Sequence, residues 1–304
     1  MNKEFLDLAE QLKSSVSCTV RLNELMSGHT SFKIGGPADI LVLPESIEQL
    51  REVLKVVKET VVPLTLLGNG SNVLVRDKGI RGIVIKLGNM LRHFYEAEDL
   101  LVFGSGYSLA LASYKAMECG KTGMEFAVGI PGSIGGAVYM NAGAYDGEMQ
   151  NIVNCVKVMD LQGNERVLTA EELNFGYRKS LQNSGLIVTE VTLKMPSGNK
   201  DEIKSKMDDF SHRRISKQPL EMPSAGSMFK RPPGYFAGTL IDQAGLKGYT
   251  VGGAQISTKH AGFVVNVGGA TAADVLQLIK DVQTKIKAGV GVELQPEVLV
   301  IGEE

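Results

Sequence analysis

Apolar positions along this chain follow two spacings, one typical of α-helices and the other typical of β-strands. Near the N-terminus, Phe5, Leu8, Ala9 and Leu12 share one face, which predicts a helix over residues 1–15. The segments ADILVLP, VPLTLLG, NVLVRD and GIVIKL are short apolar runs bounded by turn-forming residues, as strands are. The first part of the chain is therefore predicted to mix helices with short strands.

A second helix is predicted between the first two of these strands. Ser46 is a suitable N-cap, and Gln49 stands where its capping-box partner would be. Four apolar residues would form the buried stripe of this helix: Ile47, Leu50, Leu54 and Val57. The order strand, helix, strand resembles a nucleotide-binding half-domain.

The middle of the chain continues the mixture of strands and helices. Strand-like runs occupy Leu100–Gly104 and much of residues 151–195. Helices are predicted over residues 108–119 and, in a charged segment, over residues 199–214. The segment KQPLEMPSAG that follows contains two prolines and is typical of a link between domains.

The C-terminal part is predicted to be a separate α+β unit. Thr271 caps a long helix, and VELQPEVLVIG closes the chain as a strand interrupted by Pro296. The inward-facing residues of that helix would be Val275, Ile279, Val282 and Ile286. The whole chain is thus expected to be α+β, and the expected domains are residues 1–85, 86–214 and 215–304.

Composition excludes several classes of protein. The chain has 304 residues, 22% of them charged, and a net charge of −2, which argues against nucleic acid or an anionic membrane as the main partner. The three cysteines have no pair-like spacing, which fits a reducing compartment, and the N-terminal segment is not a signal peptide. No apolar run approaches the ~20 residues of a membrane-spanning helix. We therefore expect a cytoplasmic protein.

Two glycine-rich segments are the most informative feature of the sequence. GIPGSIGGAVYMNAGAY, residues 129–145, carries no charge before Asp146, and LGNGSNVLV lies at residues 67–75. Glycines permit positive φ angles and close approach of a ligand, and bare amide groups can line a pyrophosphate. The alternative is a pair of tight turns between strands. Taken together, the two segments favour one large nucleotide cofactor.

Other motifs carry less weight. The triplet Gly120-Lys121-Thr122 lacks the earlier glycine that a phosphate-binding P-loop requires, because position 115 is Lys115. No GxGxxG segment follows a strand in the arrangement of a dinucleotide-binding Rossmann domain. The four histidines are scattered and form no cluster with cysteine, so no metal site is expected.

Three polar groups stand out as candidate chemistry. Ser227 lies on a small-residue turn before Lys230 and Arg231, Arg178 lies in YRKS, and Glu297 interrupts an apolar terminal segment. A serine beside cations could donate a proton or hold an anion, and a carboxylate among apolar residues is costly unless it is paired or functional. Each also has an ordinary structural interpretation, respectively a basic turn, a strand end and an ion-paired carboxylate.

The order of these motifs resembles one known family. HTSFKIGGPAD, LGNGSNVLV, GIPGSIGGAVYMNAGAY, YRKS, PSAGSMFKRP, FAGTLIDQAGLKGY, ISTKHAGFVVN and LQPEV resemble the UDP-N-acetylenolpyruvoylglucosamine reductases, the MurB family, in their shorter form. The resemblance runs from about Leu22 to Gly302. Two positions depart from it, because Asp146 stands where glycine is common and Gln295 where glutamate is common.

The resemblance implies a fold and a cofactor. The fold would be a two-subdomain FAD-binding fold of the vanillyl-alcohol-oxidase-like type, plus a C-terminal α+β domain that closes over the substrate. FAD would be bound non-covalently and reduced by NADPH, and the product would be UDP-N-acetylmuramate for peptidoglycan. The expected partners are the UDP-sugar substrate and NADPH, with no nucleic acid and no membrane insertion.

Site residues follow from the resemblance position by position. The catalytic residues would be Arg178, Ser227 and Glu297. Substrate would contact Tyr145, Lys230 and Arg231. FAD would contact Gly68, Asn69, Gly70, Ser71, Asn72, Gly129, Pro131, Gly132, Ser133, Gly135, Gly136, Asn141 and Ala142.

The proposed chemistry explains why these residue types are suitable. An enolpyruvyl double bond is electron-rich, so it accepts hydride only if its carboxylate draws off the developing negative charge. Arg178 and Glu297 would stabilise that charge, and Ser227 would protonate the neighbouring carbon, helped by Lys230. The rival interpretations are another flavin oxidoreductase of the same fold, a non-catalytic nucleotide-binding regulator and a structural protein with glycine-rich turns.

Overall fold

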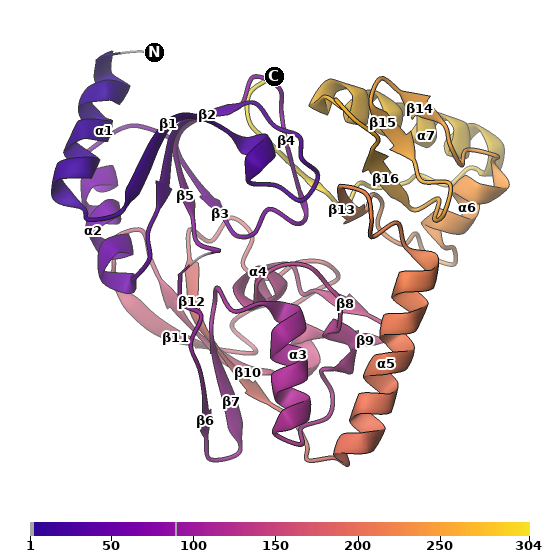
Figure 1. The fold of residues 1–304 in the computed structure, drawn as a ribbon, viewed down its shortest axis with the longest axis horizontal. Helices are drawn as coiled ribbons and strands as arrows, with labels where there is room; N and C mark the ends of the chain where they lie inside the picture. The colour runs from indigo at the N-terminus through magenta and orange to yellow at the C-terminus, as the bar shows by residue number, and fades with distance from the viewer. Residues whose placement is uncertain (1–2, 89) are drawn as a thin grey trace. The chain divides into compact units, whose positions relative to one another are not determined.

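The computed structural model describes residues 3–88 and 90–304, which form two compact units (Figure 1). Unit 1 comprises residues 1–21, 40–69 and 83–214, and unit 2 comprises residues 22–39, 70–82 and 215–304. Both units are therefore assembled from segments that are far apart in the sequence. Among the described residues, no helix combines the length and the apolar character needed to cross a membrane.

The N-terminal sheet has the strand order β1-β2-β5-β3. Its strands are β1 (Thr19–Leu25), β2 (Pro37–Leu43), β5 (Ile80–Lys86) and β3 (Leu64–Leu67), and β3 runs parallel to β5. Helix α2 (Ile47–Lys58) connects β2 to β3, which confirms the predicted strand-helix-strand order.

Two helices belong to this part of the chain, and both were predicted. Helix α1 (Lys3–Ser15) buries the expected Leu8, Ala9 and Leu12. Helix α2 buries Leu50, Val53, Leu54 and Val56, so the expected stripe was wrong at Ile47 and Val57, which are only half-buried.

The N-terminus of α2 is capped almost as expected. Ser46 accepts a hydrogen bond from the Gln49 amide at 3.2 Å. The Gln49 side chain, however, accepts from the amide of Glu45 at 2.7 Å, one residue before the N-cap. The return half of the capping box is therefore displaced by one residue.

A second sheet forms the core of the rest of unit 1. Its order is β11-β10-β12-β7-β6, with β11 (Glu165–Thr169), β10 (Val153–Met159), β12 (Ile187–Lys194), β7 (Leu100–Gly104) and β6 (Phe94–Ala97). Helices α3 (Leu109–Glu118) and α4 (Ile134–Tyr139) share a buried cluster with one face of this sheet (Figure 1). Strand β6 was not predicted, because FYEA has no clear alternation of apolar and polar residues.

Short elements complete unit 1 and its boundaries. In unit 1 they are the 3₁₀ helices η2 (Glu125–Ala127) and η3 (Met149–Asn151) and the strands β8 (Gly143–Ala144) and β9 (Gly147–Glu148); a further 3₁₀ helix, η1 (Met26–Gly28), belongs to unit 2. Helix α5 (Lys200–Lys217) continues three residues beyond the predicted end at residue 214.

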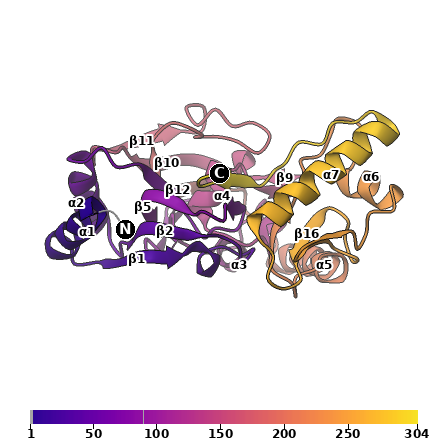
Figure 2. The same ribbon diagram turned by 90° about the horizontal axis from the view of Figure 1, so that it is seen from above.

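Unit 2 has its own sheet and core. The sheet order is β13-β16-β15-β14, with β13 (Ser224–Ser227), β16 (Phe263–Asn266), β15 (Ala254–Ile256) and β14 (Thr250–Val251). Helices α6 (Ala237–Gln243) and α7 (Ala272–Val290) pack with it, and Figure 2 shows α7 lying along this unit. All four predicted inward residues of α7 are buried, which confirms that part of the prediction.

The chain ends in a short strand. β17 (Leu299–Ile301) pairs in parallel with β4 (Val73–Val75), with Leu299 opposite Val73. The predicted interruption at Pro296 is confirmed, because this residue has no amide hydrogen and forms only an isolated bridge. The predicted strand was nevertheless too long, because the ladder begins only at Leu299.

Helix α7 is capped twice. Thr271 and Asp274 form a capping box, and the Asp77 carboxylate accepts from the amides of Ala272 and Ala273 at 2.7 and 2.9 Å. A carboxylate at this end satisfies amides that have no partner within the helix and complements the helix dipole.

Replacing Asp77 by alanine should therefore loosen the first turn of α7. The expected cost is ~0.5–2 kcal/mol, the usual scale for losing a helix cap. Hydrogen exchange of the peptide that begins at Thr271 should accelerate, and Asp77→Asn, which keeps one acceptor oxygen, should give a smaller effect. Unchanged exchange in Asp77→Ala would show that the capping box alone holds this end.

Candidate functional site

Within unit 1, the beginning of the first glycine-rich segment, residues 67–69, lies beside the second segment. A Cβ atom placed on Gly68, in the first segment, would be 3.6 Å from the hydroxyl oxygen of Ser133, in the second. About sixty-five residues separate these positions in the sequence, so the fold brings them together. This proximity is what one cofactor gripped by both segments requires.

The second segment is fixed by its own backbone. The amides of Ile134 and Gly135 donate to the carbonyls of Tyr107 and Ser105, each at 2.9 Å, and Ser133 caps α4 by accepting from the Gly136 amide at 3.3 Å. A Cβ on Gly135 would lie 2.7 Å from the Ser105 Cβ, so only glycine fits there. The loop is thus held tightly against the end of β7.

The outer part of the same loop is exposed and conformationally unusual. Gly129 and Gly132 have φ angles of 72° and 129°, which L side chains rarely adopt. Gly129, Pro131 and Gly136 are exposed. A bare, exposed backbone of this kind suits the close approach of a nucleotide.

The first segment presents its amides rather than its carbonyls. The Ser31 amide donates to the carbonyl of Gly70 at 3.1 Å, and the Leu299 amide donates to the carbonyl of Asn72 at 3.0 Å. In the described part of the chain, no main-chain amide of residues 70–72 donates a hydrogen bond. The residues present therefore fit a pyrophosphate, whose oxygens need amide donors.

The side chain of Asn141 has a structural role in the second loop. It is fully buried, and its amide group donates to Glu148 Oε2 and to the carbonyl of Gly176 at 3.1 and 3.0 Å. Its carbonyl side-chain oxygen accepts from the Gln150 amide at 3.0 Å. Any contact of Asn141 with FAD would thus come from its main chain. The amide of the neighbouring Ala142 donates to the carbonyl of Ala137 at 2.8 Å.

Arg178 is fastened to the same loop. Its Nη2 donates to the carbonyl of Gly143 at 2.9 Å and its Nη1 to that of Asn141 at 3.4 Å. It occupies a tight turn between Gly176 and Lys179 with φ 58°, a left-handed conformation that is costly for a long side chain. Such strain marks a position where the side chain matters more than local stability.

Tyr145 and Asp146 form the two-residue turn between β8 and β9. Both have positive φ angles, 49° and 63°. The Tyr145 ring stacks on Phe210 with centroids 4.3 Å apart, and its hydroxyl donates to the Phe210 carbonyl at 3.3 Å. The exposed Asp146 thus stands at a left-handed position, which glycine would adopt without strain.

Arg214 is a residue near this loop to which the sequence analysis assigned no role. It is 8% exposed, its guanidinium carbon lies 5.7 Å from the Tyr145 ring centroid, and burial lowers its pKa. A Cβ on Gly129 would lie 2.9 Å from Arg214 Cδ, so the glycine makes room for this arginine. The sequence shows only a basic helix end, which by itself does not reveal the burial.

Within unit 2, the chain brings Ser227, Lys230 and Glu297 together on neighbouring segments. The Glu297 amide donates to the carbonyl of Met228 at 2.8 Å, and the Lys230 amide donates to that of Gln295 at 2.9 Å. Phe229 and Pro296 form an isolated bridge between them. Ser227 is exposed at the end of β13 and Glu297 is half-buried.

Two further residues support this pair of segments. The Asn72 side chain donates to the carbonyl of Glu297 at 3.1 Å, so this residue of the first glycine-rich segment anchors the catalytic candidate. The Arg231 guanidinium carbon lies 4.0 Å from the Phe236 ring centroid, which fixes its direction. Gln295 is exposed, and its described bond is made by the main chain.

The triplet Gly120-Lys121-Thr122 is not a phosphate site in this fold. Lys121 is buried and pairs with Asp99, and Thr122 donates to Glu125 at 2.6 Å. The carboxylate of Glu125 is nearly buried, which opposes ionisation, yet its bonds to Thr122 and to the Gly123 amide lower its pKa overall. The triplet is therefore committed to internal contacts.

Replacing Asp146 by glycine should stabilise unit 1 slightly, because glycine adopts the left-handed conformation without a side-chain penalty. The expected gain is about 1 kcal/mol or less, since aspartate tolerates this conformation better than most residues. Asp146→Ala should move the thermal midpoint in the opposite direction. Equal midpoints for the glycine and alanine variants would show that the φ angle is not what limits stability here.

Comparison with known proteins agrees with this arrangement. The profile of an FAD binding domain matches residues 38–169, and the profile of the UDP-N-acetylenolpyruvoylglucosamine reductase C-terminal domain matches residues 218–301. These two matches confirm the expected order of an FAD-binding part followed by a C-terminal part.

Similar proteins cover nearly the whole chain. UDP-N-acetylenolpyruvoylglucosamine reductases from Clostridium perfringens (strain SM101) and Geobacillus thermodenitrificans are 50% and 51% identical, over 99% and 93% of this chain and 98% and 93% of theirs. The crystal structure of the reductase (MurB) from Thermus caldophilus is 39% identical and matches with a TM-score of 0.79, over 93% of this chain and 99% of that one. The chain therefore belongs to the family of UDP-N-acetylenolpyruvoylglucosamine reductases, which are oxidoreductases with an FAD-binding domain.

Proposed function

We propose that this protein reduces the enolpyruvyl group of UDP-N-acetylglucosamine enolpyruvate to give UDP-N-acetylmuramate, a precursor of peptidoglycan. NADPH is the reductant and FAD is bound non-covalently. The observation that carries the proposal is the attachment of Arg178 to the glycine-rich loop that would hold the flavin. A fixed positive charge beside the cofactor loop is what a reaction that develops negative charge requires.

Bound FAD would supply the hydride, after accepting it from NADPH. The double bond of an enol ether resists hydride addition, because it is already electron-rich. The chain's own task is to stabilise the negative charge that develops toward the substrate carboxylate. Arg178 suits this task because two main-chain carbonyls hold its guanidinium in one direction, so little reorganisation is needed during the reaction.

Ser227 and Glu297 would complete the chemistry from unit 2. The exposed Ser227 hydroxyl is accessible to donate a proton to the substrate carbon next to the carboxylate. A hydroxyl is a weak acid, and Lys230, three residues further along the same segment, is the cation expected to favour proton release. Glu297 lies on the segment bonded to Met228, one position from Ser227.

The substrate diphosphate would be held by Lys230 and Arg231, and Tyr145 would contact the substrate from its turn. Lys and Arg are the usual ligands of phosphate groups. Arg231 is already oriented by its contact with Phe236. The three-domain division and the cytoplasmic location remain predictions.

The visible spectrum of the purified protein tests the proposal directly. Under anaerobic conditions the bound flavin should give a yellow protein that NADPH bleaches, and the enolpyruvyl UDP-sugar should restore the colour. Bleaching without recovery would leave the flavin assignment standing and overturn the substrate. A flavin that stays with the denatured polypeptide would favour a related oxidase with covalently attached cofactor.

Ser227→Ala should separate the two half-reactions. Flavin reduction by NADPH should remain normal, and reoxidation by the UDP-sugar should slow by at least ~10²-fold, the scale for losing a general acid. Stopped-flow absorbance of the flavin measures both rates, and Ser224→Ala on the same strand is a matched control. Equal slowing of both half-reactions would contradict the assignment of Ser227 as the proton donor.

A further inference from the structure

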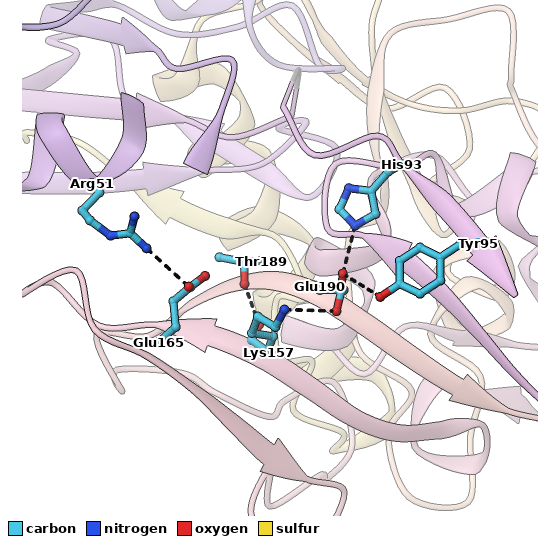
Figure 3. A network of polar contacts seen from close by, with 7 residues as sticks. All are labelled: Arg51, His93, Tyr95, Lys157, Glu165, Thr189 and Glu190. Atoms are coloured by element: carbon cyan, nitrogen blue, oxygen red, sulfur yellow. Dashed lines mark hydrogen bonds and ion pairs between the residues drawn. The ribbon is translucent and has the colours of Figure 1, made fainter. Parts of the chain in front are cut away.

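In unit 1, three side chains contact the carboxylate of Glu190, where the second sheet meets an irregular segment. Glu190, on β12, accepts from His93 Nε2 at 3.0 Å and from the Tyr95 hydroxyl at 3.3 Å, and it lies 3.5 Å from Lys157 Nζ (Figure 3). Its side chain is only 17% exposed. The same figure shows a second, separate pair on this side of the unit, between Arg51 and Glu165.

A glycine makes the contact between His93 and Glu190 possible. Gly104 of β7 is the direct cross-strand partner of Glu190. A Cβ at Gly104 would lie 2.8 Å from His93 Cε1, so any side chain there would displace the ring. The absence of a side chain at Gly104 therefore opens the space through which His93 reaches the carboxylate.

His93 ends a segment that we call the bracing segment, residues 87–88 and 90–93. Its last part pairs with the end of β7, because the Gly104 amide donates to the His93 carbonyl at 3.0 Å and the Gly106 amide to the Leu91 carbonyl at 3.1 Å. Leu91 has a φ of 55°, so the segment contains a strained residue that needs support from its surroundings.

The bracing segment contacts the first glycine-rich loop. The Leu87 amide donates to the Leu67 carbonyl at 2.8 Å. A Cβ on Gly88 would lie 3.4 Å from the carbonyl carbon of Gly68 and closer still to the Asn69 side chain. The beginning of the segment thus packs directly against Gly68 and Asn69.

Through β7, the bracing segment also supports the second loop. The residues Gly104 and Gly106, which bond to the segment, flank Ser105. Ser105 in turn accepts from the Gly135 amide at 2.9 Å. The bracing segment therefore contacts the first loop directly, and Ser105 connects it to the second loop.

We propose that His93 is a positioning residue of the FAD site, which acts by holding the bracing segment on Glu190 and thereby keeping both glycine-rich loops in their binding conformation. This inference rests on the proposed binding of FAD by these loops. The effect of His93 passes through the backbone, because the amides of Gly104 and Gly106 donate to this segment and flank Ser105. A hydrogen bond to a carboxylate is stronger than one between two neutral groups.

The surroundings favour His93 over its neighbours for this role. Tyr95 binds the same carboxylate from strand β6, and Lys157 binds it from β10, but both belong to regular strands whose ladders hold them. Burial and the nearby Glu190 raise the pKa of Tyr95, so its hydroxyl keeps its proton and donates. His93 is the member of the cluster that is attached to the irregular segment.

The test compares three variants of the purified holoenzyme. His93→Ala should raise the dissociation constant of FAD by about fivefold or more, corresponding to ~1 kcal/mol. His93→Gln, which can still donate from Nε2 to Glu190, should restore most of the affinity. Tyr95→Phe is the matched control, since it removes a bond to the same carboxylate without involving the bracing segment, and it should bind FAD as the wild type does.

Two measurements distinguish an effect on the FAD site from a general loss of protein stability. Free flavin recovered by ultrafiltration gives the dissociation constant, and the thermal midpoint of each FAD-free protein gives stability. We expect weaker FAD binding in His93→Ala, with an FAD-free midpoint lowered no more than that of Tyr95→Phe. Unchanged affinity, no rescue by glutamine, or an equal loss in Tyr95→Phe would overturn this inference alone, whereas failure of the wild type to bind FAD would overturn the proposed function and this inference with it.

Discussion

Close approach of one backbone to another is the constraint on which unit 1 depends. Gly135 lies so near Ser105 that no side chain fits between them, because an added Cβ would be 2.7 Å from the Ser105 Cβ. This approach lets the amides of Ile134 and Gly135 bond to the end of β7, which fixes the second loop without any long side chain. A cofactor site made mainly of backbone gains its rigidity from such packing, because glycine itself contributes none.

Four of the ten described non-glycine residues with positive φ angles lie on the second loop, next to it, or bonded to it. Arg178, Asn141, Tyr145 and Asp146 all have positive φ angles, and the Arg178 side chain bonds to the carbonyls of two residues of the loop. Each such residue costs of the order of 1–3 kcal/mol, so the surrounding contacts must hold it in place. The buried amide of Asn141 and the stacking of Tyr145 on Phe210 are two contacts that do so. Conformations that are poor locally are therefore maintained because they direct the guanidinium and shape the loop.

The sequence predicted elements whose signals are local. Helix α7 follows from a regular apolar repeat and a threonine cap, and the two glycine-rich segments are visible as composition alone. Strand β6 was not predicted because its sequence alternates poorly, and the terminal strand was predicted too long because the apolar residues before Leu299 resemble a strand without forming a ladder. The contacts of Arg178 join residues 35 and 37 positions apart, and no local pattern encodes such pairs. The resemblance to a family could name Arg178, but only the fold shows what holds it.

In unit 2 the first glycine-rich segment has a second task. The Asn72 side chain donates to the Glu297 carbonyl, and its own carbonyl accepts from Leu299. These two bonds tie the segment to the terminal strand on both sides of Val298, where β17 begins its parallel pairing with β4. A change in the segment on binding a nucleotide would therefore reach the main chain of Glu297 through one side chain. Because the Glu297 amide also bonds to Met228, next to Ser227, the same connection extends to the proposed proton donor. The first glycine-rich segment and the catalytic candidates of this unit thus belong to one hydrogen-bonded structure, and a substitution at Asn72 is expected to act on both.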